Sequence, residues 1–426
     1  MTIRFNSQVD KKALQNALQT LVDRHEVLRT VYFRKDSELM QQVLDYQPVD
    51  FKMTNVVCQS WEEVASLVEE TAREPFDLKH DCLLRCRLFS RDTNDHLCLI
   101  VTNHIAVDAL AFALLLNEFR SLYQVCHTES NQAYHTRSKI VLPPVKFSFS
   151  DYLRCQTEML QGKEGERLWH YWQKQLSGNL KRLNLPTDYP RPSKASHYGA
   201  CYSFEIDDVL TQKLRNIAQN EAGTLYRIFL TALNILLHYY TKQDDILVAT
   251  HTLNRARAEF FDIVGYLAET TIIRTKISDQ SEFLELLRQV GKTVSEAKKY
   301  QGYPMKLLSE RLHFPEDICS VWLTMLPRRY SDERKIKIKS AETGVLNMEP
   351  FNNIIPSWLG VWYELEISLT EEPNIVSGLI AYSTDLFKEG TIAKIINDFK
   401  TLLKTIASAP TIKIQNLLKE FAFDPQ

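Results

Sequence analysis

Residues 97–119, LCLIVTNHIAVDALAFALLLNEF, constrain the fold of this chain more than any other stretch. Its apolar start predicts a short strand over residues 97–101, and the spacing of the leucines beyond Asp108 is helical. The Asp108 carboxylate can cap that helix by accepting hydrogen bonds from its free N–H groups. His104 then lies in the turn where the strand ends, a common place for functional side chains. The stretch therefore predicts a strand, a histidine turn and a buried helix.

Length and repetition predict two domains. The chain has 426 residues, more than a single hydrophobic core usually supports. Strand-like and helix-like segments alternate in both halves, which predicts an α/β protein with mixed sheets and flanking helices. Residues 185–192, LPTDYPRP, cannot lie inside a helix because each proline removes an N–H donor. We therefore expect an N-terminal lobe at residues 1–180 and a C-terminal lobe at residues 181–426.

Several local elements can be predicted from capping and periodicity. Asp10 is a good N-cap for an amphipathic helix with Leu14, Leu18 and Leu21 on one face. We also predict one strand over residues 42–51 and one helix over residues 61–71. His25 lies near a helix end, where we expect a hydrogen-bonding rather than a catalytic role.

Composition and motifs exclude several classes of function. The net charge of −2 gives no indication of nucleic-acid binding. Neither a signal-peptide core nor a membrane-length apolar run occurs, so we expect a cytoplasmic protein without a membrane contact. The eight cysteines are scattered without zinc-site spacing and predict reduced thiols and no metal site. No phosphate-binding loop, dinucleotide fingerprint or hydrolase elbow is present, so no nucleotide should be needed.

Residues 328–339, RRYSDERKIKIK, form a basic but interleaved stretch. The alternation of charged and apolar residues favours a solvated hairpin. A docking surface for an acidic partner is the alternative, since such a charge field steers association.

Short motifs along the chain match a known family in order. Residues 24–30 fit RHExLRT, and residues 103–109 fit HHxxxDG with Asn103 and Ala109 as departures. Residues 149–152, 185–192, 265–274, 300–304 and 382–387 resemble YxDY, LPTDxPRP, GxFVNTxxxR, HQDYPF and YxTDLF. The chain thus resembles the condensation domains of nonribosomal peptide synthetases over nearly its whole length. Family members usually begin with an SxAQxRLW-type segment; here that segment is either trimmed or upstream.

The resemblance implies two chloramphenicol-acetyltransferase-like lobes in a V-shaped pseudo-dimer, with a tunnel between them. It implies a catalytic His104, because imidazole can take a proton from an attacking amine near neutral pH. Asn103, and Asp108 paired with Arg274, would support the site structurally, since a buried carboxylate needs a partner. The residues expected to contact substrate are Ala109, Gly265, Tyr266, Glu269 and Tyr303.

The implied activity joins a carrier-bound acyl or peptidyl thioester to an amine, in nonribosomal peptide or hybrid polyketide–peptide biosynthesis. The partners are then donor and acceptor carrier proteins, each carrying a phosphopantetheine arm, and the chain itself binds no cofactor. Two alternatives remain. One is an ester-forming or soluble-acceptor acyltransferase of the same fold. The other is a catalytically degenerate domain that recruits a partner protein, which the departures at Asn103, Ala109 and Glu269 would suit.

Overall fold

The computed structural model of the chain describes residues 1–130, 142–326, 348–350 and 360–420. Two compact units share these residues. Unit 1 consists of Met1–Glu158, Arg255–Ala268 and strand β11 (Met348–Pro350), and unit 2 contains the other described residues. The domain boundary expected after residue 180 remains a prediction. Internal contacts divide the chain after Glu158 and group later segments of the chain with unit 1.

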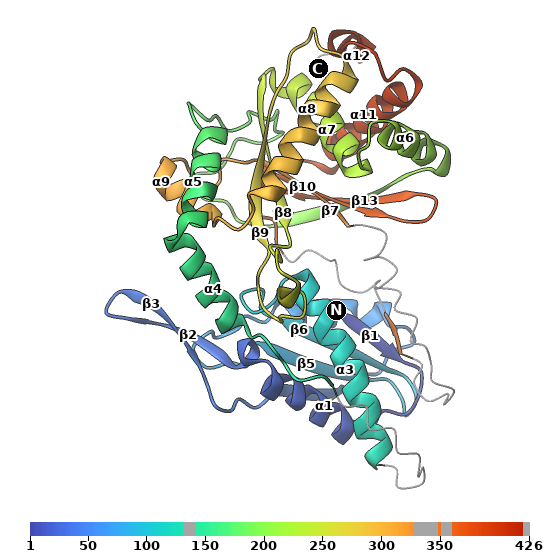
Figure 1. Cartoon of the computed structure of the whole chain (residues 1–426). Helices are drawn as coiled ribbons and strands as arrows, with labels where there is room; N and C mark the ends of the chain where they lie inside the picture. Colours follow the sequence, from blue (N-terminus) through green and yellow to red (C-terminus); the bar gives the residue numbers. More distant parts are fainter. Residues whose placement is uncertain (131–141, 327–347, 351–359, 421–426) are drawn as a thin grey trace. The chain divides into compact units, whose positions relative to one another are not determined.

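Unit 1 is built on a mixed five-stranded sheet in the order β11-β1-β6-β5-β4 (Figure 1). Strand β4 pairs parallel to β5, and the other neighbours pair antiparallel. A separate hairpin is formed by β2 (Thr30–Lys35) and β3 (Glu38–Val43). The other elements are β1 (Thr2–Phe5), α1 (Lys11–Arg24), β4 (Asp50–Asn55), α2 (Ala65–Arg73), β5 (Leu84–Ser90), β6 (His96–Thr102), α3 (Ala109–Ser130) and α4 (Phe149–Gln161).

Both faces of this sheet are covered, because its central strands are apolar on both sides. In β6, Cys98 and Ile100 join a core with α1 and α3, whereas Leu97 and Leu99 join a second core with α2. Successive side chains of a strand point to opposite faces, so one continuous apolar run supplies both cores. The predicted strand, turn and helix at residues 97–119 are therefore confirmed as β6, the His104 turn and α3.

One local prediction is wrong, and another is confirmed with shifted bounds. The strand expected over residues 42–51 is two strands, β3 and β4, separated by a loop that contains Pro48. Proline cannot donate to a strand ladder, which explains the interruption. The helix expected over residues 61–71 begins later, because Glu62–Val64 form a 3₁₀ turn before α2. The hairpin expected at residues 328–339 lies outside the described residues.

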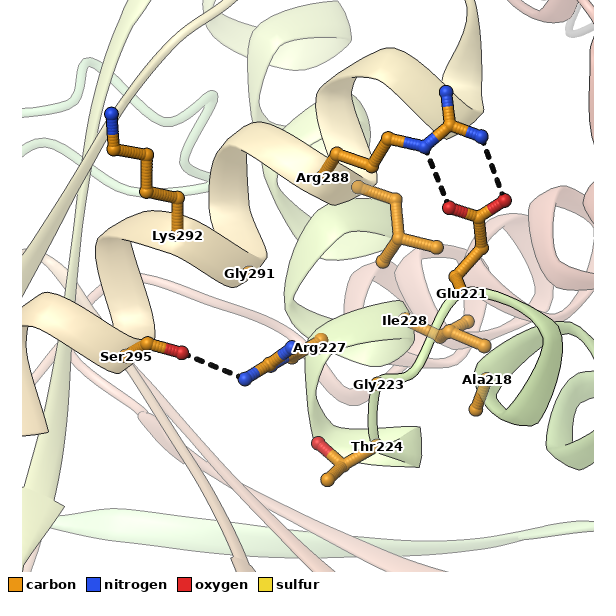
Figure 2. Close-up of a pocket in the computed structure, with 11 residues that line it drawn as sticks. Ala218, Glu221, Gly223, Thr224, Arg227, Ile228, Arg288, Gly291, Lys292 and Ser295 are labelled. Carbon is orange, nitrogen blue, oxygen red and sulfur yellow. Dashed lines mark hydrogen bonds and ion pairs between the residues drawn. The ribbon is translucent and has the colours of Figure 1, made fainter.

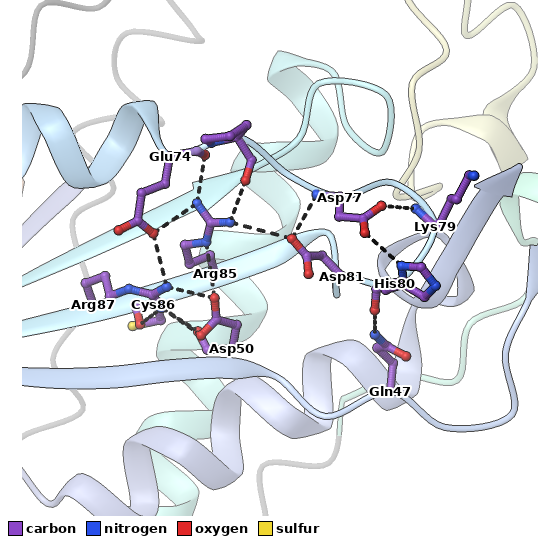
Figure 3. A network of polar contacts seen from close by, with 11 residues as sticks. Gln47, Asp50, Glu74, Asp77, Lys79, His80, Asp81, Arg85, Cys86 and Arg87 are labelled. Carbon is purple, nitrogen blue, oxygen red and sulfur yellow. Dashed lines mark hydrogen bonds and ion pairs between the residues drawn. The ribbon is translucent and has the colours of Figure 1, made fainter.

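Two arginines of β5 are buried against the edge strand β4 (Figure 3). Arg85 and Arg87 are only 4% and 6% exposed. The Asp50 carboxylate accepts from Nε of Arg85 at 3.1 Å and from both terminal nitrogens of Arg87 at 2.7 and 2.9 Å. Arg85 also donates to the carbonyls of Glu74 and Pro75. Burying charge is costly unless it is paired, so this network holds β4 in register with β5.

Unit 2 contains a mixed six-stranded sheet in the order β7-β13-β12-β10-β8-β9. Helix α7 is buried along most of its length and contacts α6, α8 and α11, which explains why its sequence is apolar almost all round. The elements of unit 2 are α5 (Lys163–Gln175), β7 (Gly199–Ile206), α6 (Asp208–Asn220), α7 (Leu225–Thr241), β8 (Asp245–Thr252), β9 (Glu269–Lys276), α8 (Phe283–Lys299), α9 (Met305–Leu312), β10 (Val321–Leu326), β12 (Leu365–Glu371), β13 (Val376–Ser383), α11 (Glu389–Ser408) and α12 (Ile414–Glu420). Two mixed sheets with flanking helices confirm the predicted α/β class.

Candidate active site

The turn that carries His104 is held by Asn103. Its carbonyl accepts from the Ala106 N–H at 3.0 Å, and its own N–H donates to the Leu83 carbonyl at 3.2 Å. Its side-chain Oδ1 accepts from the Ile105 N–H at 3.0 Å, an Asx-type turn. These three bonds fix the turn at the end of β6, and His104 is the exposed residue that the turn presents.

The imidazole of His104 has a defined hydrogen-bonding arrangement. Its Nδ1 lies 2.8 Å from the Val107 carbonyl oxygen. A carbonyl can only accept, so in the neutral ring Nδ1 carries the proton and Nε2 keeps its lone pair. Within the part of the chain that the structure describes, Nε2 has no hydrogen-bond partner. The ring also meets Tyr266 edge to face, with centroids 5.1 Å apart. An exposed lone pair on a fixed ring is suited to accepting a proton.

Asp108 is buried and ion-paired with Arg255. Their side chains are 3% and 0% exposed, and the two carboxylate oxygens accept from Nη1 at 2.7 Å and Nη2 at 3.1 Å. Asp108 Oδ1 also accepts from the Ala111 N–H at 2.8 Å, which confirms the predicted cap of the helix after His104. The paired oxygens and the cap together compensate the desolvation of this carboxylate.

The segment after Arg255 is fastened to the same carboxylate. Asp108 Oδ2 accepts from the N–H groups of Leu267 and Ala268, each at 3.0 Å. Gly265 is needed for close packing, because a Cβ there would come within 2.4 Å of the Phe149 ring. This packing favours a structural role for Gly265 over the expected substrate contact. Tyr266, the next residue, is 38% exposed beside His104, which agrees with a position at the site.

The predicted pair of Asp108 with Arg274 is wrong. Arg274 lies in β9 of unit 2 and forms its ion pair with Asp245, at 2.8 Å and 2.6 Å from Nε and Nη2. It also donates to the carbonyls of Gln175 and Ser177, at the end of α5. The hydrogen bonds to Asp245 raise the pKa of Arg274. Arg274 is thus paired with Asp245, and Asp108 with Arg255.

The remaining predicted residues have separate environments. Ala109 is exposed at the first position of α3. Glu269 begins β9 in unit 2, where its Oε1 accepts from the Met305 N–H at 3.2 Å and burial raises its pKa. Tyr303 is 6% exposed in the core of unit 2, and its hydroxyl accepts from Arg311 at 2.6 Å. Burial favours a packing role for Tyr303 over the expected substrate contact.

Sequence reasoning missed Arg255. It follows β8 in the stretch HTLNRARAEF, and Arg257 lies two residues later, so residue type alone does not single it out. Asn254, directly before it, adopts a left-handed conformation with φ of 51°. Asparagine tolerates this region better than most residues, so an asparagine at position 254 is a weak sequence signal of a turn before Arg255.

Polar residues of the other motifs have structural partners. His25 is buried and bonds to Glu118 at 2.6 Å, as expected for a residue at a helix end. Burial raises the pKa of Glu118, but hydrogen bonds from His25 and Arg24 outweigh it and hold the pKa below its usual value. In unit 2, Asp188 accepts from the Lys388 N–H at 2.8 Å, just before α11 begins. These residues hold elements together.

Among the described residues, no cluster of three or more histidine, cysteine or acidic side chains has the arrangement of a metal site. In the same part of the chain, no helix combines the length and apolar character needed to cross a bilayer.

Comparisons with known proteins agree over nearly the whole chain. A family model described as "Condensation domain" matches residues 1–421. Tyrocidine synthase 2 of Brevibacillus parabrevis is 30% identical over 418 residues, covering 97% of this chain and 11% of that protein. Tyrocidine synthase 3 of the same organism is 28% identical over 417 residues, covering 97% of this chain and 6% of that protein. The chain therefore spans about a tenth or less of the length of these relatives.

Solved structures share the fold at lower identity. The complex of the X-domain and OxyB from teicoplanin biosynthesis has a chain with a TM-score of 0.84 at 21% identity, covering 98% of this chain and 89% of that one. The condensation domain from the monacolin K polyketide synthase MokA has a TM-score of 0.78 at 17% identity, covering 97% of this chain and 93% of that one.

Proposed function

The chain belongs to the condensation domain family, and we propose that it joins a carrier-bound acyl or peptidyl thioester to an amine, forming an amide bond. The proposed setting is nonribosomal peptide or hybrid polyketide–peptide biosynthesis; the proteins named above include two tyrocidine synthases and the condensation domain of a polyketide synthase. Donor and acceptor carrier proteins supply the substrates on phosphopantetheine arms. The observation that carries the proposal is the His104 ring, whose Nε2 lone pair has no protein partner among the described residues.

The reaction forms a C–N and an S–H bond and breaks a C–S and an N–H bond. The amine nitrogen attacks the thioester carbonyl carbon, the C–N bond forms, and the C–S bond breaks. His104 Nε2 accepts the proton that leaves the nitrogen and returns it to the departing sulfur of the donor arm. Holding the two arms with their reacting groups together supplies most of the rate, because the attack becomes effectively unimolecular.

Asp108 and Arg255 act in this proposal without touching substrate. The carboxylate holds the start of α3, the guanidinium and the N–H groups of residues 267 and 268 at once. It thereby fixes the segment that places Tyr266 against the His104 ring. Both are positioning residues.

A recruiting role without catalysis is the second candidate. Asn103 occupies the place of the first motif histidine and binds the Ile105 N–H of the turn through its Oδ1, and Ala109 replaces the motif glycine. One solved relative is an X-domain in complex with OxyB, which illustrates partner binding by a domain of this fold. The same site also leaves open an ester product or a soluble acceptor.

A product assay separates these functions. The purified chain is incubated with acyl-loaded carrier protein and a panel of carrier-bound and soluble amines and alcohols, and products are identified by mass spectrometry. We expect an amide from a carrier-bound amine, and its loss in His104→Ala. An ester alone would replace the proposal by the acyltransferase alternative. No product across the panel, together with binding of a partner protein, would favour recruitment.

A further inference from the structure

We propose that a cavity in unit 2, remote in sequence from the His104 turn, binds a small phosphate-type anion. The cavity has a volume of about 260 Å³ and lies where the turn between α6 and α7 meets α8 (Figure 2). Three cationic side chains and one carboxylate are among its lining residues, so its charge is positive. These four are Arg227, Arg288, Lys292 and Glu221.

Among the described residues, only one of these three cations has a carboxylate within ion-pair distance. Arg288 forms a two-bond ion pair with Glu221, at 2.7 and 2.8 Å. Arg227 is half-buried and donates through Nη2 to the Ser295 hydroxyl at 2.8 Å, and in the described part of the chain no carboxylate lies within ion-pair distance of it. An anion in the cavity would supply the counter-charge that no described carboxylate gives this guanidinium. The planar guanidinium matches two oxygens of a phosphate.

Neutral donors complete the lining. The Thr224 hydroxyl lines the cavity and does not cap α7. The Ser295 oxygen accepts from Arg227, which leaves its own proton available to a ligand. Lys292 follows Arg288 by one helical turn on α8, and although its ammonium points away from Arg227 in Figure 2, its flexible stem can swing toward the cavity. Hydroxyls and cations of this kind suit an oxyanion.

Gly291 packs against the Arg227 side chain. A Cβ on Gly291 would lie 3.3 Å from Nη1 of Arg227, tighter than most Cβ contacts, and 3.4 Å from its Cδ, so the arginine side chain would have to shift by a few tenths of an ångström. Glycine inside a helix is unfavourable relative to alanine, so a substitution to alanine should favour α8 itself while crowding the guanidinium. The substitution to alanine is therefore expected to weaken anion binding without lowering the stability of α8.

Phosphate binding is measured by calorimetric titration of the full chain with sodium phosphate, with chloride adjusted to keep the ionic strength constant. We expect saturable binding that is weakened about tenfold or more in Arg227→Gln, since a charge-assisted bond is lost. Arg154→Gln, an exposed arginine on α4, is the matched control and should leave the affinity unchanged. O-phosphoserine in a parallel titration distinguishes the source. Tighter binding than phosphate identifies a phosphate ester as the ligand, and equal or weaker binding identifies free phosphate.

Gly291→Ala guards against a folding artefact in Arg227→Gln. We expect it to weaken phosphate binding while its melting temperature without phosphate stays equal to or above that of the wild type. The proposal is overturned if the wild type binds neither probe saturably, or if both Arg227→Gln and Gly291→Ala bind phosphate as the wild type does. Neither result depends on condensation activity, so the amide-forming proposal stands or fails separately.

Discussion

At the scale of single residues, the turn before α3 depends on an acceptor at position 103. Asn103 Oδ1 binds the Ile105 N–H, and the Asn103 carbonyl binds the Ala106 N–H. The sequence identified both Asn103 and His104 through the motif. It could not show that His104 Nδ1 is bound to its own turn, because the direction of an imidazole is set by backbone geometry.

Substitutions at Asn103 test this role. Asn103→Leu removes the acceptor at similar volume, and we expect it to lower the free energy of unfolding by about 1 kcal/mol. Asn103→His retains an acceptor in its ring nitrogen and should stay nearly as stable as the wild type. Urea denaturation of both variants measures the difference. Equal losses in the two would show that the hydrogen bond to Ile105 is not what matters.

At the scale of elements, the start of α3 and the segment Arg255–Ala268 are held by one buried ion pair. Asp108 was predicted correctly as a helix cap but was assigned the wrong arginine. Sequence order explains the error: the motif that ends in Arg274 suggested a partner, whereas Arg255 lies before that motif, after a tight change of direction. The sequence alone does not show which arginine pairs with which aspartate when the partners lie far apart along the chain.

A double-mutant cycle tests the corrected pair. Asp108→Ala and Arg255→Ala should each cost about 3–5 kcal/mol, because each leaves a buried charge uncompensated, and the double variant should cost far less than the sum. Hydrogen exchange should also show loss of protection at the Leu267 and Ala268 amides. Arg274→Ala combined with Asp108→Ala is the control and should be additive, since Arg274 binds other groups. Additive losses for Asp108 and Arg255 would contradict the pairing.

The network between β4 and β5 predicts a loss of stability in acid. Burial raises the pKa of Asp50, but the hydrogen bond and charge of Arg87, together with Lys52 and Arg85, outweigh it and hold the pKa below the ordinary value of 3.8. The folded pKa is thus lower than the unfolded one. The stabilisation that the ionised Asp50 gives to the folded state is fully present above the unfolded pKa, and it is lost as the pH falls through the folded pKa.

Asp50→Asn removes this dependence. We expect a lower urea midpoint than the wild type at pH 7 and a smaller decline on acidification to about pH 3. Asp36→Asn, at an exposed turn between β2 and β3, is the matched control and should leave the midpoint unchanged. A wild-type decline that Asp50→Asn reproduces in full would place the acid sensitivity elsewhere.

At the scale of the whole molecule, the sequence predicted an α/β chain with two mixed sheets, and the structure confirms that class. It did not predict that Arg255–Ala268, from the second half of the chain, would be grouped with unit 1. Periodicity in the sequence predicts local structure, but the unit against which a loop packs depends on long-range contacts such as that of Asp108 with Arg255. The motifs predicted the His104 turn, while the contacts that support it emerged only from the fold.

In the proposed reaction, His104 acts chemically in amide formation. Its most direct test is the single-turnover rate of acyl transfer from a loaded carrier protein to a carrier-bound amine. We expect His104→Ala to reduce this rate by about 10²–10⁴-fold with an unchanged urea midpoint, as for loss of a general base. His80→Ala, an exposed histidine of the same unit, should retain the wild-type rate. Transfer by His104→Ala at the wild-type rate would rule out a chemical role for His104.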